Sequence, residues 1–180
     1  MKHSPDLNNT LNLLDAPADL HSWITDNGSL TQKLVEASGG NFEVKVIEES
    51  WQTQHSAEEQ KLLGLVDDQS VLIREVALCC FGVPWVYARS LLPDSTLIGP
   101  ERELEFLRNK PLGEVLFKHP DMQRGPIQIS KLGADTVNQR LGELLAEALT
   151  ESAWGRASLF YLSSKPLLVS EYFLPSVVQC

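Results

Sequence analysis

Three segments with strand-like alternation each carry one charged residue on a face that is otherwise mostly apolar. These residues are Arg74, Arg89 and Glu171. Alternate side chains of a β-strand share a face, which fixes the expected neighbours of each charge. An unpaired charge on such a face costs on the order of several kcal/mol. The neighbours are Leu72, Val76, Leu78 and Cys80 for Arg74, then Trp85, Tyr87 and Leu91 for Arg89, then Leu167, Val169 and Phe173 for Glu171.

Two interpretations of these charges stay open on the pattern alone. In the first, Glu171 forms an internal salt bridge with one arginine, or the arginines reach solvent along their apolar stems. One carboxylate cannot neutralise two guanidinium groups, however. In the second interpretation a ligand supplies the missing negative charge, and a small molecule with two carboxylates suits two planar arginine forks. Glu171 would then hydrogen-bond the ligand or exchange a proton with it.

The segments that hold these residues pair as two hairpins. "SVLIREVALCC" (70–80) and "PWVYARSLL" (84–92) flank the turn "FGVP", and "GRASLFYLSSKPLLVSEYFLP" (155–175) turns at 163–166. A further strand is expected at 41–51, which alternates with period two, and a short one at 125–132. Residues 52–69 read as a loop with a short helical turn, and we expect their acidic run to be a solvated surface.

Helices are expected between these strands. They fall around 17–27, at 29–40 with Ser29 as the cap and Gly39 and Gly40 as the stop, as two short helices within 93–117, and at 135–152. Antiparallel hairpins with interspersed helices indicate an α+β fold with a single antiparallel sheet. We expect one domain over 1–180, with polar coil at 1–16 and a helical insert at 134–150.

Composition narrows the class of partner. The net charge of −9 argues against binding a nucleic-acid backbone, although local cations can still hold a small anion. No apolar run approaches the roughly 20 residues of a membrane-spanning helix, and the first 20 residues lack the pattern of a signal peptide. The three cysteines and four scattered histidines lack metal-site spacing, so no metal is expected. We expect a cytoplasmic protein.

Several stretches in one order resemble the chorismate pyruvate-lyases of bacterial ubiquinone biosynthesis. They are "REVALCCFGVPWVYARSLLP", "STLIGPE", "LRNKPLGEVLF" and "WGRASLFYLSSKPLLVSEYFLP", and the likeness covers about 70–175. The resemblance implies an enzyme that converts chorismate to 4-hydroxybenzoate and pyruvate without a cofactor. It also implies a single antiparallel sheet with helical flaps over an enclosed pocket, in a protein expected to be a monomer.

The resemblance assigns roles to the three charged residues. Arg74 and Arg89 fall on the family's ligand-binding arginines and Glu171 on its pocket glutamate, while Leu30 and Leu112 fall on apolar flap positions. For both leucines a plain core role is an alternative. We expect Arg74 to hold the ring carboxylate and Arg89, a catalytic candidate, the enolpyruvyl carboxylate. Glu171, the other catalytic candidate, would contact the C4 hydroxyl. The helical segment 134–150 departs from the family pattern.

The leading alternative is a non-catalytic domain of the same fold that binds or senses an aromatic acid. The family's fold also serves as the sensor of bacterial transcription regulators, which place a basic DNA-binding domain before it. Residues 1–40 hold two lysines, no arginine and five acidic residues, which does not suit that task. Retention of a ligand without turnover would reveal a stand-alone binding protein.

Overall fold

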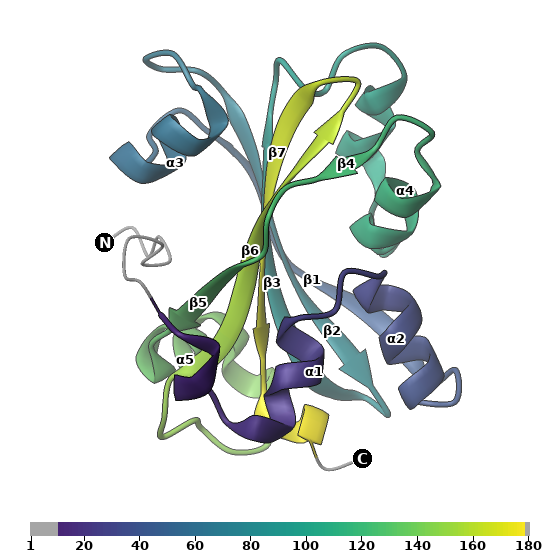
Figure 1. Cartoon of the computed structure of the whole chain (residues 1–180), viewed down its shortest axis with the longest axis vertical. Coiled ribbons are helices and arrows are strands. Elements are labelled where there is room, and N and C mark those ends of the chain that lie inside the picture. Colours follow the sequence, from purple (N-terminus) through teal and green to yellow (C-terminus); the bar gives the residue numbers. More distant parts are fainter. Residues whose placement is uncertain (1–10, 179–180) are drawn as a thin grey trace.

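The computed structural model describes residues 11–178, which form helices around one antiparallel sheet (Figure 1). Within these residues the sheet has seven strands, six of them in the order β1-β2-β3-β7-β6-β4. Strand β5 also pairs directly with β6, along a different stretch of that strand from β4. This confirms the predicted α+β class. The strands are β1 (Phe42–Gln52), β2 (Val71–Cys80), β3 (Val83–Pro93), β4 (Gln123–Arg124), β5 (Gln128–Leu132), β6 (Ala153–Leu162) and β7 (Lys165–Phe173).

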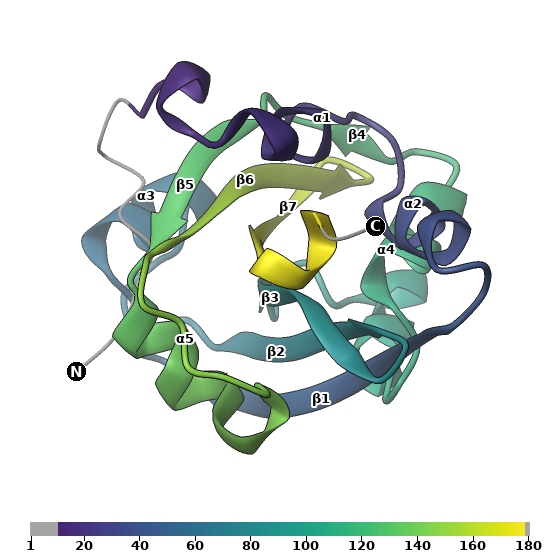
Figure 2. The same ribbon diagram turned by 90° about the horizontal axis from the view of Figure 1, so that it is seen from below.

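Helices cover both faces of the sheet (Figure 2). On one face α1 and α2, and then α4, pack on apolar side chains of the strands. On the other face α3 and α5 do the same. The α-helices are α1 (His21–Ile24), α2 (Leu30–Ala37), α3 (Ala57–Leu63), α4 (Leu112–Lys118) and α5 (Ala134–Leu141). Short 3₁₀ segments lie at Leu13–Asp15, Ala18–Leu20, Gly99–Phe106, Gly142–Leu144 and Pro175–Val178. None of the helices described is long and apolar enough to cross a bilayer.

Both predicted hairpins are present. Strands β2 and β3 connect through Phe81 and Gly82, and β6 and β7 through Ser163 and Ser164, all at positive φ. Two consecutive residues at positive φ are typical of the tight turns whose twist matches that of paired strands. These turns set the register of the two hairpins that form the middle of the sheet.

The segment 135–152 was predicted to form one helix, but in the structure only its first part is α-helical. Helix α5 ends at Leu141, because Gly142 adopts a positive φ of 49°. The chain then folds back, and the Asn138 side chain exchanges two hydrogen bonds with the backbone of Leu149. Most of the apolar side chains that suggested a long helix still pack on the sheet, whereas Ala148 is exposed. Those that pack are Val137, Leu141, Leu144, Leu145 and Leu149.

The acidic run at 52–69 also differs from expectation. It contains α3, which begins with a capping box between Ser56 and Glu59. Glu59 is only 3% exposed, so the prediction of a wholly solvated surface was wrong for this residue. Of the predicted N-terminal coil, 1–10 lie outside the described residues, and Leu13–Asp15 form a 3₁₀ turn instead.

Candidate active site

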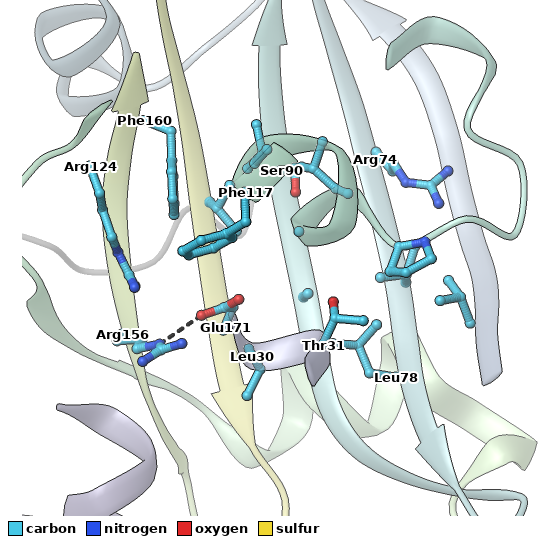
Figure 3. Close-up of a pocket in the computed structure, with 18 of the residues that line it drawn as sticks. Leu30, Thr31, Arg74, Leu78, Ser90, Phe117, Arg124, Arg156, Phe160 and Glu171 are labelled. Carbon is cyan, nitrogen blue, oxygen red and sulfur yellow. Dashed lines mark hydrogen bonds and ion pairs between the residues drawn. The ribbon is translucent and has the colours of Figure 1, made fainter. Parts of the chain in front are cut away.

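A pocket lies between the sheet and the first turns of α2 and α4 (Figure 3). The space between its walls is about 580 Å³, a figure that includes the part open to solvent. Its floor comes from β1, β2, β3, β7 and β6, and most of its lining is apolar. The charged and hydroxyl side chains that line it are Thr31, Arg74, Ser90, Arg124, Arg156 and Glu171.

The register of the sheet explains why these side chains meet. Val76, Ala88, Glu171 and Arg156 are successive cross-strand partners on β2, β3, β7 and β6. Directly opposed residues share a face, so this row faces the pocket together. Arg74, two residues before Val76 on β2, has its side chain on the same face.

Arg74 lies on one side of the pocket and is 2% exposed. Its Nη2 donates to the carbonyl oxygens of Arg108 and Lys110, at 2.7 and 3.1 Å. Its Nη1 lies 3.1 Å from Oε1 of Glu49 but makes no hydrogen bond with the described residues. Burial lowers the pKa of this guanidinium and Glu49 opposes the shift, yet arginine stays protonated at neutral pH. Arg74 is therefore a buried cation with donor capacity to spare.

Glu171 lies on the opposite side of the pocket from Arg74, in an ion pair with Arg156 (Figure 3). Nε of Arg156 donates to Oε2 of Glu171 at 2.7 Å. Nη1 of Arg156 donates to the carbonyl oxygens of Trp23 and Asp26, at 3.0 and 2.5 Å. Arg156 thus fixes the Glu171 carboxylate and is itself largely satisfied by protein acceptors.

Arg124, from β4, lies beside this pair. Its Nε donates to Oγ of Ser158 at 3.2 Å, and its Nη1 donates to the carbonyl of Asp26 at 3.3 Å. Its guanidinium sits 5.1 Å from the centre of the Phe160 ring. Burial and the charge of Arg156 both lower the pKa of Arg124. Among the described lining residues, three guanidinium groups face one carboxylate. Arg74 also pairs with Glu49, which does not line the pocket, so of the three only the Arg124 guanidinium lacks a carboxylate partner within residues 11–178.

Leu30 and Leu112 are the first residues of α2 and α4, and both line the pocket. Both also belong to the buried apolar core, so a flap role for them stays a prediction. Ser29 caps α2 by accepting the amide of Gln32 at 3.3 Å. The two helices approach closely at Gly113, where an added Cβ would lie 3.0 Å from Oγ1 of Thr31. The pocket is covered at this contact by residues about 80 positions apart in the sequence.

Arg89, the third predicted site residue, is not among the residues that line this pocket. Arg89 is the cross-strand partner of Ser170, the residue before Glu171. Its side chain therefore projects from the face of the sheet opposite to the pocket. There its Nη1 donates to Oε1 of Glu59 at 2.7 Å, and its Nε lies 3.5 Å from Oε1 of Glu75. Glu75 also accepts from Arg140 of α5, at 2.6 Å. This ion-pair network joins α3, the sheet and the insert.

Two pocket cations, Arg156 and Arg124, were missed by the sequence reasoning. The pattern that singled out Arg74, Arg89 and Glu171 is also present at Arg156. It alternates with Trp154, Ser158 and Phe160 and is the one charge on that face of its strand. Arg124 shows no such pattern, because β4 is two residues long. Within residues 11–178 no group of histidine, cysteine or acidic side chains could hold a metal ion.

Comparison with known proteins places this chain in a family. The family model for chorismate lyase matches residues 8–179. A probable chorismate pyruvate-lyase of Shewanella sp. (strain ANA-3) is 36% identical over 95% of this chain and 87% of its own length. One from Marinobacter nauticus is 38% identical over 87% of this chain and 77% of its own length.

Similar solved structures show the fold alone. The effector domain of PhnF from Mycobacterium smegmatis has a TM-score of 0.61 at 17% identity, over 83% of this chain and 90% of that one. The ligand-binding domain of a putative GntR-family transcriptional regulator from Bordetella bronchiseptica has a TM-score of 0.56, also at 17% identity, over 76% and 86%. From the family model and the relatives, the chain belongs to the chorismate lyase family.

Proposed function

We propose that this protein converts chorismate to 4-hydroxybenzoate and pyruvate, the first committed step of ubiquinone biosynthesis. The observation that carries the proposal is a lining with three guanidinium groups and one carboxylate, in a mostly apolar pocket of a chorismate lyase family member. Chorismate has a ring carboxylate and an enolpyruvyl carboxylate, and each can accept from a guanidinium group. That the protein is a cytoplasmic monomer remains a prediction.

Arg74 is the residue proposed to hold the ring carboxylate. Its Nη1 is buried, lies 3.1 Å from Oε1 of Glu49 and makes no hydrogen bond with the described residues, so it can still donate to a ligand. The first amides of an α-helix lack intrahelical acceptors, and Leu30 and Leu112, the first residues of α2 and α4, line the same pocket. The amides of Gln32 and Glu114, two residues further on, already donate to Ser29 and Pro111. A carboxylate placed between Arg74 and these helix starts would gain charge-assisted hydrogen bonds. The two leucine side chains would cover the ring.

Glu171 is proposed to contact the C4 hydroxyl of the substrate. Its described hydrogen bond uses Oε2, which leaves Oε1 able to accept the hydroxyl hydrogen. In the reaction the bond between C3 and the ether oxygen breaks, C4 loses a proton, and the new double bond makes the ring aromatic. The enolpyruvyl group gains a proton to become pyruvate, so no redox partner is needed. The protein's task is to orient the substrate and to stabilise the departing anion.

The predicted contact between Arg89 and the enolpyruvyl carboxylate is not carried into this proposal. On the opposite face of the sheet, Glu59 already accepts a hydrogen bond from the Arg89 guanidinium, and Glu75 forms an ion pair with it. We infer that Arg89 supports the strands that carry Ser90 and Glu171, without touching the substrate.

The test is to incubate purified protein with chorismate and to quantify 4-hydroxybenzoate and pyruvate by chromatography. We expect equimolar products well above spontaneous breakdown, and a loss of roughly 10- to 100-fold in kcat for Glu171→Gln, because the charged acceptor for the hydroxyl is removed. An aromatic acid that stays bound without turnover would instead identify a binding or sensing protein. Wild-type activity retained in Glu171→Gln would refute the role given to Glu171.

A further inference from the structure

Arg124 differs from the other two pocket arginines in its charge partners. Arg156 is paired with Glu171 at 2.7 Å, and Arg74 lies 3.1 Å from Glu49. For Arg124, no carboxylate of residues 11–178 lies within the 4.0 Å that defines an ion pair. Its protein contacts are a hydroxyl, a carbonyl and an aromatic ring. Arg124 is therefore a pocket cation without a direct anionic partner in the described protein.

The position of Arg124 relative to Arg74 adds a second constraint. Arg74 lies on one side of the pocket, and Arg124 lies on the other with Arg156 and Glu171 (Figure 3). Ser90 and apolar side chains such as Phe117 separate the two arginines. One carboxylate cannot serve both ends. A ligand that satisfies both needs two anionic groups separated by an apolar body.

The ring contact holds the Arg124 side chain in place. Its guanidinium lies over Phe160 of β6, and its Nε is fixed by Ser158 of the same strand. A preorganised guanidinium loses less freedom when it pairs with a ligand carboxylate than a flexible one does. The geometry thus suits recognition of a planar anion beside the Glu171–Arg156 pair.

We propose that Arg124 binds the second carboxylate of the substrate, the one on the enolpyruvyl group, and so distinguishes the dianionic substrate from the monoanionic product. This inference rests on the proposed function for the identity of the substrate. The ring carboxylate at Arg74 is common to chorismate and 4-hydroxybenzoate, whereas only chorismate has a group for Arg124. Elimination leaves the second carboxylate on pyruvate, so the contact that favours the substrate is absent from the aromatic product. Arg124 is a specificity residue under this proposal.

Two matched ligands test the inference without any turnover. 4-Hydroxy-3-methoxybenzoate carries one carboxylate, and 3-(carboxymethoxy)-4-hydroxybenzoate carries a second one on the ether substituent, at the ring position that corresponds to C3 of chorismate. Dissociation constants are measured by isothermal titration calorimetry for wild type, Arg124→Gln and Arg124→Lys. Arg102→Gln serves as a control, because Arg102 is an arginine on the surface with a 70% exposed side chain. Circular dichroism and thermal melting verify that each variant is folded.

Wild type is expected to bind the dianion at least tenfold more tightly than the monoanion. Arg124→Gln should lose most of this preference while its affinity for 4-hydroxy-3-methoxybenzoate stays within about twofold, and Arg124→Lys should retain part of it. Equal weakening of both ligands in Arg124→Gln, or no preference in wild type, would overturn the inference. Chorismate turnover measured in parallel separates the two proposals. A preference that depends on Arg124, without turnover, would refute the enzyme and leave the anion site standing.

Discussion

Replacing Glu59 by glutamine should destabilise the protein without changing its chemistry. Glu59 is 3% exposed and accepts from Nη1 of Arg89 at 2.7 Å. Glutamine at this position can still complete the capping box with Ser56, so the substitution removes the charge and keeps the helix cap. The effect therefore reports on the ion pair with Arg89.

The magnitude follows from the partners that remain. Removing one partner of a buried ion pair costs about 3–5 kcal/mol. Glu75 still lies 3.5 Å from Nε of Arg89, so Arg89 keeps part of its compensation and we expect about 2 kcal/mol. A domain of this size loses roughly 2–4 °C of Tm per kcal/mol, which gives a decrease of about 4–8 °C. Glu147→Gln, at an exposed site, is the control and should melt like wild type.

The pH dependence has a defined sign. Burial alone would raise the pKa of Glu59, but Arg89 and the Ser56 amide outweigh it, and the net shift is below the ordinary 4.5. A carboxyl group with a lowered folded-state pKa stabilises the protein above its unfolded pKa. This stabilisation is lost as the pH falls through the lower folded-state value. The difference in Tm between wild type and Glu59→Gln should accordingly be full at pH 7 and shrink once the pH drops below about 4.

The assay combines thermal melts between pH 3 and 8 with chorismate kinetics at 20 °C. Because Arg89 lies on the face away from the pocket, kcat and KM should stay within about twofold of wild type while the Tm falls. A loss of turnover without a loss of Tm would refute the reasoning, and would return Arg89 to the substrate contact expected from the sequence.

Two further substitutions test the pocket. Arg74→Gln should raise both the KM for chorismate and the Kd for 4-hydroxybenzoate by at least about tenfold, because both ligands carry the ring carboxylate. Initial rates give the KM and calorimetry gives the Kd. A change in only one of the two constants would contradict the assignment. Gly113→Ala should weaken 4-hydroxybenzoate binding several-fold, because its Cβ would lie 3.0 Å from Oγ1 of Thr31 and push α4 from α2. Adding Thr31→Ala removes that oxygen and should restore binding, whereas failure of this rescue would place the effect elsewhere.

Alternation along each strand was enough to single out Arg74 and Glu171, and the structure places both in the pocket. It could not place Arg89. Alternation shows which side chains share a face within one strand, but not which face of that strand is aligned with which face of the neighbouring strand. A shift of one residue in the register moves every side chain to the other side. In the sheet Arg74 is opposite Ser90, so Arg89 falls on the other face with Glu75.

The same limit explains the buried Glu59. Its neighbours in sequence are polar, and local composition indicated a solvated loop. Only the packing of α3 on the sheet brings it to Arg89, 30 positions later in the chain.

The sequence by itself determined the α+β class, the two hairpins, the family and two of the pocket's charged residues. These depend on local periodicity, turn residues and motifs, which are properties of short stretches of chain. Tertiary structure alone decided that Arg156 and Arg124 join Glu171, that Arg89 leaves the pocket, and that α2 and α4 meet over it. Each of these depends on strand register or helix packing between distant segments, and no single segment contains that information.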